Sequence, residues 1–139
     1  MKASATEYRK EKLEKERLAK IAREKKETFV DKDTNLMWQD SSKNVERTWQ
    51  SAIDYCKDLN YAGYNDWRLP TYYELIGIVD YSRYNPAIKR GFKNTVSNRY
   101  WSSEYVSDSG NAWYVYFKGG YSDDGNKSGN LYVRCVRAG

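Results

Sequence analysis

The spacing of apolar residues changes along the chain, from a helical period in the middle to alternation near the end. Residues 48–59 predict a helix that Thr48 caps, because their apolar positions recur every three or four residues. These positions are Trp49, Ala52, Ile53, Cys56 and Leu59. A second helix is expected after Pro70, with Thr71 and Glu74 as a reciprocal capping box. Its core-facing residues would be Leu75, Ile78 and Val79.

Strand patterns flank the two helices. The stretch FVDKDTNLMWQD, residues 29–40, places apolar runs on either side of an Asp- and Asn-rich turn and predicts a short hairpin. Near the end, YWSSEY, AWYVYFKGG and LYVRCVR are each expected to form a strand. The residues of the second strand expected to face the core are Trp113, Val115 and Phe117. Two helices followed by antiparallel strands, with both chain ends in one sheet, define an α+β fold.

The N-terminal segment has a different character. It is rich in Glu, Lys, Arg, Ala and Leu and contains no Gly or Pro, so it predicts a helix. Its apolar residues do not keep the 3.5-residue period of a coiled coil. They are Leu13, Leu18, Ile21 and Ala22. We therefore expect residues 1–27 to be a solvated helical stalk or linker and residues 28–139 to be the folded domain, with homo-oligomerisation through the helix as the alternative.

Most of the net charge belongs to this segment. Residues 1–27 contain ten Lys or Arg and six Glu, whereas residues 28–139 contain fourteen Lys or Arg and thirteen acidic residues. The nearly neutral domain argues against a nucleic-acid partner. No apolar run reaches the ~18 residues of a membrane span, and the N-terminus lacks the apolar stretch of a signal peptide. The chain is therefore expected to be either cytoplasmic or an exported domain that has lost its leader.

The inventory of side chains argues against an enzyme. The sequence has no His, which removes Ser-His-Asp triads, His-activated cysteines and His-containing zinc sites. Asp123 and Asp124 are expected in a solvated turn, and the surrounding SDDGN departs from the EF-hand pattern, so no cofactor is predicted, with calcium as the alternative. Arg68 in NDWRLPTYYEL has no base or nucleophile beside it. We expect Arg68 to be a buried or half-buried scaffold residue with a carboxylate or backbone partner.

Five sequence blocks together resemble a known family. They are DTNLMWQD, TWQSAIDYCKDLNYAGYNDWRLPTYYEL, YWSSEY, AWYVYF and YVRCVR. In order and spacing, over residues 29–138, they resemble the domain at the C-terminus of Legionella collagen-like adhesins. The resemblance implies a C-type lectin-like fold, related to formylglycine-generating enzymes and to retroelement variable proteins, in which RLPT marks the second helix. Structural roles are expected for Trp67, Arg68, Pro70, Thr71, Glu74, Trp101 and Trp113. The formylglycine-generating activity is not carried over, because only Cys135 lies near the C-terminus.

The same resemblance implies a disulfide between Cys56 and Cys135. C-type lectin-like folds join their first helix to their final strand in this way, and both sequence patterns turn these cysteines inward. Their Cα atoms are then expected about 4.4 to 6.8 Å apart. A disulfide would favour an extracellular or cell-surface location. Two buried free thiols in the cytosol are the alternative.

Binding is the function that remains. Residues 103–132 are crowded with Tyr, Ser, Asp, Asn and Gly, which is the composition of antibody-like binding surfaces. The predicted ligand-binding residues are Tyr105, Asp108, Asn111, Tyr114, Tyr116, Tyr121, Asp123, Asp124, Asn126 and Tyr132. We predict a non-enzymatic adhesin-type or receptor-binding module that recognises a glycan, a polyanionic polysaccharide or a protein. The alternatives are an assembly module, as an oligomeric tip or cap, and a hypervariable target of a diversity-generating retroelement.

Overall fold

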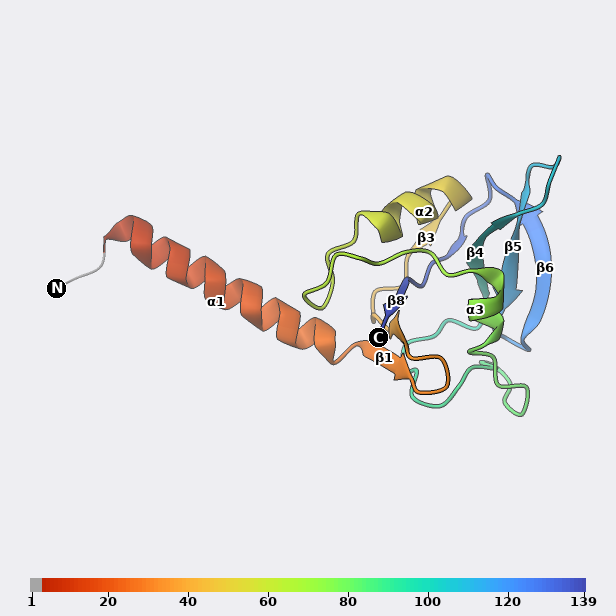
Figure 1. Cartoon of the computed structure of the whole chain (residues 1–139), viewed down its shortest axis with the longest axis horizontal. Helices are drawn as coiled ribbons and strands as arrows, with labels where there is room; N and C mark the ends of the chain where they lie inside the picture. Colours follow the sequence, from red (N-terminus) through yellow and green to blue (C-terminus); the bar gives the residue numbers. More distant parts are fainter. Residues whose placement is uncertain (1–3) are drawn as a thin grey trace.

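The computed structural model describes residues 4–139 and has the α+β class expected from the sequence. The helices are α1 (Ala5–Lys25), α2 (Trp49–Lys57) and α3 (Tyr72–Ile76). The strands are β1 (Thr28–Asp31), β2 (Leu36–Gln39), β3 (Glu46–Arg47), β4 (Arg99–Tyr105), β5 (Asn111–Tyr116), β6 (Tyr121–Asn126), β7 (Leu131–Tyr132) and β8 (Val136–Ala138). Figure 1 shows α1 projecting from a body that contains all the other elements. The closer likeness to C-type lectins stays a prediction.

The strands form two sheets. The predicted hairpin is present as β1 and β2, and β8 joins it to give the order β1-β2-β8. The two ends of the folded body therefore meet in one sheet, as expected. The second sheet has the order β3-β7-β4-β5-β6. Within it, β4 and β7 run parallel, which corrects the expectation that all the strands are antiparallel.

The predicted C-terminal strand LYVRCVR is two strands, β7 and β8, which lie in different sheets. The crossing between them is made by Val133 to Cys135, and a buried Arg134 lies at its centre. The Arg134 guanidinium donates to the Asp40 carboxylate at 3.2 Å and to the Gln39 carbonyl at 2.6 Å. Alternation along the sequence does not reveal this break, because the partners of Arg134 lie far from it in the chain, at residues 39–40 and 94–95.

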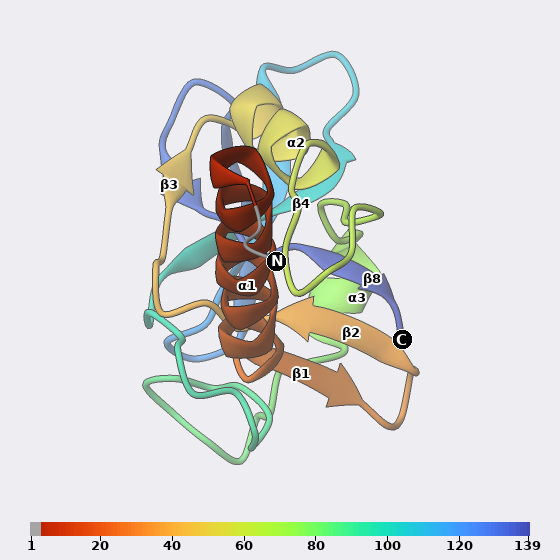
Figure 2. The same ribbon diagram turned by 90° about the vertical axis from the view of Figure 1, so that its left-hand side faces the viewer.

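Helix α1 is polar along its whole length. Ser4 and Glu7 form a capping box at its start, and none of its residues is buried. Leu13 and Leu18 are 58% and 52% exposed. Figure 2, seen from the side of α1, shows α2 above this helix and the β1–β2 hairpin to the right of its lower end. The predicted helix is confirmed, and the division of the chain at residue 27 stays a prediction. No helix within residues 4–139 is long and apolar enough to cross a membrane.

Helix α2 buries Ala52 and Cys56, as its periodicity predicted. Thr48 occupies the N-cap position, but its hydroxyl makes no capping hydrogen bond, which corrects the expectation of a side-chain cap. At this end of the helix, the backbone N–H of Trp49 donates to the carbonyl of Lys127 at 3.0 Å. The start of α2 is therefore fixed partly by a loop that is distant in sequence.

The opening of α3 matches the predicted capping box. The Glu74 amide donates to the Thr71 hydroxyl at 3.2 Å, and the Thr71 amide donates to the Glu74 carboxylate at 2.8 Å. The same carboxylate accepts two hydrogen bonds from Arg68, at 2.6 and 2.7 Å. Arg68 has the expected carboxylate partner, and its side chain is half-buried, with 48% of its surface exposed. Asp66 instead pairs with Arg137.

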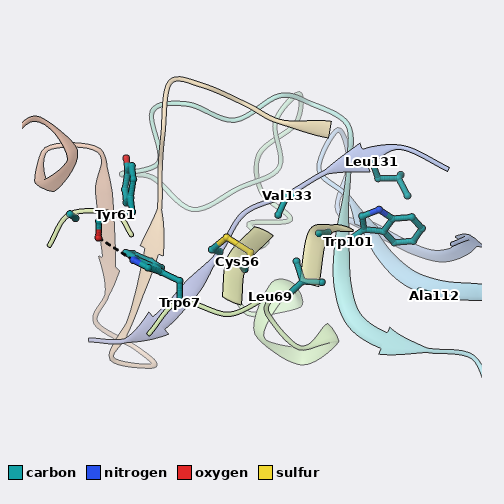
Figure 3. Close-up of a cluster of buried hydrophobic side chains, with 11 residues drawn as sticks. Cys56, Tyr61, Trp67, Leu69, Trp101, Ala112, Leu131 and Val133 are labelled. Atoms are coloured by element: carbon teal, nitrogen blue, oxygen red, sulfur yellow. Dashed lines mark hydrogen bonds between the residues drawn. A yellow bond between two sulfur atoms is a disulfide. The ribbon is translucent and has the colours of Figure 1, made fainter. Parts of the chain in front are cut away.

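The core consists of two clusters. The first surrounds a disulfide between Cys56 and Cys135, whose Cα atoms are 5.5 Å apart, and Figure 3 shows it with Trp101 and Trp67. The Trp101 indole donates to the Arg47 carbonyl at 2.9 Å, so this fully buried ring leaves no polar atom unpaired. The second cluster includes Trp38, Leu75, Ile78, Val79, Tyr100, Val115 and Phe117. The disulfide therefore joins α2 to the crossing between the sheets.

Candidate functional site

The residues predicted to bind ligand do not share one surface. Strands β5 and β6 pair in register, and because alternate residues of a strand point to opposite faces, the pleat divides the set. One face carries Tyr114, Tyr116, Tyr121 and Asp123. The opposite face carries Asn111, Asp124 and Asn126. On that face the Asn111 amide donates to the Asp124 carboxylate at 3.4 Å. A ligand that contacts one group is therefore separated from the other by the sheet.

Trp113 and Tyr114 differ from the expected pattern of inward and outward side chains. Trp113 is only partly buried, and its ring centroid lies 5.6 Å from that of Tyr72 in α3. Tyr114 is also partly buried and packs against the first cluster, with the Arg99 guanidinium 5.5 Å from its ring centroid. Both faces of the sheet are contacted by helices, α3 on β5 and α2 on β4. Strand alternation therefore does not separate core from solvent here.

The remaining predicted residues lie at other places. Tyr132 packs beside Tyr100, with ring centroids 5.6 Å apart. Asp108 is exposed, in a loop with a left-handed backbone φ of 58°. Tyr105 ends β4 and is 59% exposed, and its ring centroid lies 6.0 Å from that of Trp49. Tyr105 thus pairs with Trp49, which the helical pattern of the sequence assigned to the core.

The SDDGN segment is strand β6 and not the solvated turn expected from its composition. Asp123 and Asp124 consequently point to opposite faces and do not converge on one ion. Within residues 4–139, no cluster of three or more His, Cys, Asp or Glu side chains is placed to hold a metal. Both cysteines are in the disulfide, so neither offers a thiolate nucleophile.

A groove lies where the last turns of α1 meet the body. Its volume is about 670 Å³, and its walls come from α1, the loop after β2 and the end of α2. The cationic side chains that line it are Lys20, Arg23, Lys26 and Lys43. We call the site formed by these four residues the basic groove. Its size is typical of a pocket that holds a small organic ligand rather than a single ion.

The basic groove carries an excess of positive charge. Glu24 and Glu27 are the acidic residues along its walls. The Glu24 carboxylate accepts a hydrogen bond from the Ala62 amide at 3.0 Å. Within residues 4–139, none of the four cations forms an ion pair. Since the four cations outnumber the two carboxylates and form no ion pair with them, the groove favours an anionic ligand.

The position of α1 over the body is set by the Tyr61–Gly63 turn. Gly63 has a left-handed φ of 84°, and a Cβ atom there would lie 3.3 Å from the Ile21 side chain. The Tyr61 hydroxyl donates to the Glu27 carbonyl at 2.9 Å, and burial raises the pKa of that hydroxyl. Together with the bond between Glu24 and Ala62, these contacts hold the C-terminal end of α1 against the body. The basic groove therefore depends on this docking.

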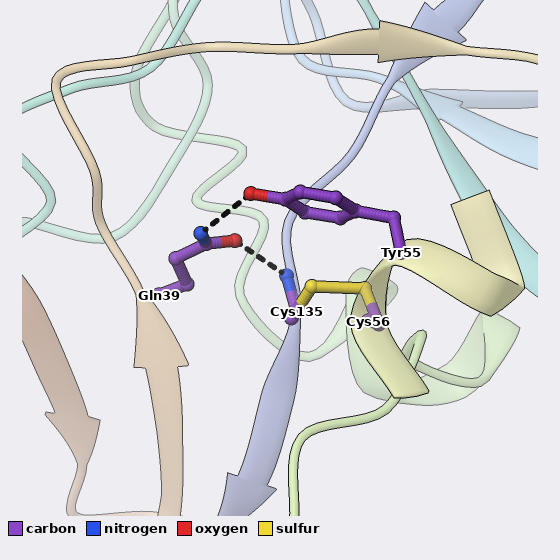
Figure 4. Close-up of a disulfide and its surroundings, with 4 residues drawn as sticks. All are labelled: Gln39, Tyr55, Cys56 and Cys135. Carbon is purple, nitrogen blue, oxygen red and sulfur yellow. Dashed lines mark hydrogen bonds between the residues drawn. A yellow bond between two sulfur atoms is a disulfide. The ribbon is translucent and has the colours of Figure 1, made fainter. Parts of the chain in front are cut away.

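The floor of the groove is connected to the disulfide (Figure 4). The Gln39 side-chain amide donates to the Tyr55 hydroxyl at 3.3 Å, and its carbonyl oxygen accepts from the Cys135 amide at 3.2 Å. Tyr55 and Gln39 both line the groove, and Cys56 is the neighbour of Tyr55. The disulfide thus fixes the backbone on both sides of the groove floor.

Sequence reasoning missed the groove. Its α1 residues lie in the segment expected to be a solvated stalk, and the excess of charge in that segment was the only signal. Helical periodicity does not reveal which of its cations face the body, because the docking contacts come from residues 61–63, far along the chain. Lys43 lies in a polar loop with no recognisable motif.

The molecule is thus a disulfide-linked α+β body with a groove in which cations exceed carboxylates. The chain belongs to the Lcl C-terminal domain family, that of the Legionella collagen-like adhesins, whose model matches residues 27–137. This match spans β1 to β7 completely and reaches into β8. A search of curated proteins returned no match.

Proposed function

We propose that this protein is a non-enzymatic binding module of adhesin type that recognises an anionic polysaccharide in the basic groove. The observation that carries the proposal is the set of four cations that line one groove without an ion pair to any residue from 4 to 139. Membership of an adhesin family supports the adhesin class and, with it, a cell-surface or extracellular location.

The groove combines charge with groups that suit a sugar. Tyr55, Asn60 and Gln39 present hydroxyl and amide groups beside the cations. Each partly exposed charge contributes little, roughly 0.2–1 kcal/mol, because water screens it. A polymer that places several sulfates or carboxylates in the groove adds these contributions. Binding should therefore weaken as salt increases, and an uncharged polysaccharide should bind poorly.

The test compares dextran sulfate with uncharged dextran by calorimetric titration of the full chain, at about 0.05 M and about 0.3 M salt. The groove variant is Lys20→Gln/Arg23→Gln/Lys43→Gln. Its matched control, Lys10→Gln/Lys12→Gln/Lys15→Gln, removes the same charge from the part of α1 outside the groove. We expect the groove variant to lose about tenfold or more in affinity and the control to lose about twofold or less. Equal losses in the two variants, or equal binding of the two dextrans, would contradict the proposal.

Assembly through α1 is a second candidate function. Exposed apolar and aromatic side chains on this helix favour it: Tyr8 at 66%, Leu13 at 58% and Leu18 at 52%. The test is the mass in solution of chains with and without residues 1–27. A change from oligomer to monomer on their removal would favour assembly, whereas a monomer in both cases would exclude it. The retroelement hypothesis would be tested by comparing codons of the predicted ligand-binding residues among sibling copies of the gene.

A further inference from the structure

Lys127 occupies a different kind of environment from the cations of the basic groove, because it lies between two aromatic rings. Its ammonium nitrogen is 4.6 Å from the centroid of the Trp49 ring and 4.7 Å from that of Tyr105. The two rings meet at an angle of 71°. We call Trp49, Tyr105 and Lys127 the aromatic clamp. It lies where α2 begins and β4 ends, near the loops that flank β5 and β6.

Backbone contacts hold two members of the clamp in place. The Lys127 amide donates to the Gly110 carbonyl at 2.8 Å, and the Lys127 carbonyl accepts from the Trp49 amide. The Trp49 indole donates to the Ser102 carbonyl at 2.8 Å, which fixes its ring. Tyr105 presents the more open ring, at 59% exposure. Because the clamp is already assembled, a ligand would lose little free energy in ordering it.

The charge of Lys127 is not neutralised by a carboxylate. It makes no ion pair with any residue from 4 to 139, and the first turn of α2 contains no acidic residue. Lys89 shows the contrast, because its ammonium lies 3.0 Å from Asp31 and 2.9 Å from Asp33. Aromatic rings stabilise an ammonium only modestly and leave its N–H donors able to reach an anion. Lys127 can therefore still bind an acidic group.

We infer that the aromatic clamp is a subsite for a single acidic sugar residue. The sugar ring would pack on the exposed face of Tyr105, and its carboxylate or sulfate would accept hydrogen bonds from Lys127. The inference rests on the proposed function, since the ligand is a residue of the same class of polymer. It adds recognition of the sugar ring to the charge recognition of the basic groove.

A nucleic acid would also combine stacking with negative charge. Single-stranded nucleic acids are usually bound by several stacking rings along a basic groove. Here Trp49 is partly buried and Tyr105 is the exposed ring, while the residues from 28 onward are nearly balanced in charge. These features favour an acidic sugar over a nucleotide chain, and oligothymidylate is therefore included as a competing probe.

The experiment follows backbone amide and indole N–H signals of the full chain by NMR during titration with short sugars. The probes are trigalacturonate, which carries carboxylates, sulfated maltotriose, which carries sulfates, and neutral maltotriose. We expect an acidic trisaccharide to shift the signals of Trp49, Tyr105 and Lys127, and the neutral one to leave them unchanged. The acidic trisaccharide that causes the shifts shows whether the subsite prefers a carboxylate or a sulfate. No shift with either acidic probe, or tighter binding of oligothymidylate, would overturn the inference.

Variants separate recognition from structure. Lys127→Gln should weaken binding of the responding trisaccharide about fivefold or more, and Tyr105→Ala should have a similar effect. Lys127→Arg and Tyr105→Phe should retain most of the affinity, because they keep the charge and the ring. Melting temperatures of all four variants identify any that fail to fold. If Lys127→Gln melts normally and binds like the wild type, the inference is wrong.

The groove variant distinguishes this inference from the proposed function. With Lys20→Gln/Arg23→Gln/Lys43→Gln, the trisaccharide shifts at the aromatic clamp should persist while dextran sulfate affinity falls. If the groove variant loses dextran sulfate binding, and the trisaccharides cause no shifts at the aromatic clamp of the wild type, the groove proposal is supported and the subsite is rejected. Shifts at the clamp without any effect of the groove variant on dextran sulfate reject the groove proposal and support the subsite.

Discussion

Helix α1 and the disulfide-linked cluster are stabilised in opposite ways. None of the residues of α1 is buried, and the helix depends on a capping box, good helix formers and docking at its last turns. In the cluster, Cys56, Cys135 and Trp101 are fully buried and come from distant parts of the chain. The basic groove needs both regions, since Lys20 and Arg23 belong to α1, Lys26 follows it directly, and the body fixes where these charges lie. Charge changes on α1 are therefore expected to alter the groove with little effect on the stability of the body.

Removing the disulfide should have the largest effect on stability. Cys56 and Cys135 are 79 residues apart, and for a loop of that length the chain-entropy relation gives about 4.5 kcal/mol. We expect Cys56→Ala/Cys135→Ala to lower the free energy of unfolding by roughly that amount in urea titrations. Reduction of the wild type should reproduce the loss. A loss below about 1 kcal/mol would show that the body does not depend on the disulfide in the way we describe.

Trp101 and Trp113 test whether burial or residue type decides the cost of losing an aromatic ring. Trp101→Ala removes a fully buried ring and should cost about 3–5 kcal/mol of unfolding free energy. Trp113 is partly buried, so Trp113→Ala should cost about 1–2 kcal/mol. Urea unfolding of both variants measures the difference. Similar costs for the two would mean that the face of β5 next to α3 is as much a part of the core as the disulfide-linked cluster.

Glu74 should make a smaller, pH-dependent contribution. The Arg68 hydrogen bonds, aided by the Thr71 amide, hold the pKa of Glu74 below its ordinary value of 4.5, against the opposing effect of burial. Since the pKa is lowered by folding, the stabilisation is present above the ordinary pKa and is lost as pH falls through the folded value. Glu74→Gln should lower the free energy of unfolding by about 1–2 kcal/mol at neutral pH. The variant should then lose less additional stability than the wild type on acidification.

The control for Glu74 is Arg68→Gln, which removes the ion pair and leaves the capping box with Thr71 intact. Arg68→Gln should lower the free energy of unfolding by less than Glu74→Gln does, because the Arg68 side chain is 48% exposed and water screens its charge. The measurement is the melting temperature of each variant as a function of pH between neutrality and the acid transition. If Glu74→Gln and the wild type lose stability in parallel as pH falls, the ionised form of Glu74 does not stabilise the fold.

Shortening α1 should have the smallest effect. Deleting residues 1–16 leaves the groove-lining Lys20, Arg23 and Lys26 in place, and the helical residues that it removes, from Ala5 to Glu16, are not buried. We expect the unfolding free energy of the body to change by about 0.5 kcal/mol or less, because surface changes away from buried contacts are nearly neutral. The helical signal in circular dichroism should fall. Dextran sulfate affinity should be largely retained. A large loss of stability would mean that α1 supports the body beyond its last turns.

Much of the local structure was predictable from the sequence. The face of α2 with Ala52 and Cys56, the capping box of Thr71 and Glu74, and the first hairpin each depend on residues a few positions apart. The prediction of a single final strand was wrong, because the break in that strand depends on a distant partner. The strand is interrupted at Arg134, whose ion-pair partner is Asp40.

The class of the fold, the capped start of α3 and the family could be predicted from the sequence, because apolar periodicity, a capping box and motif order are local properties of the chain. Where charges gather depends instead on the tertiary structure. Lys43 joins the α1 cations at the groove, and Lys127 meets Trp49 and Tyr105, because docking and strand pairing bring together residues that no sequence pattern connects. The strength of a charged site depends on distances in space, and those are set by packing.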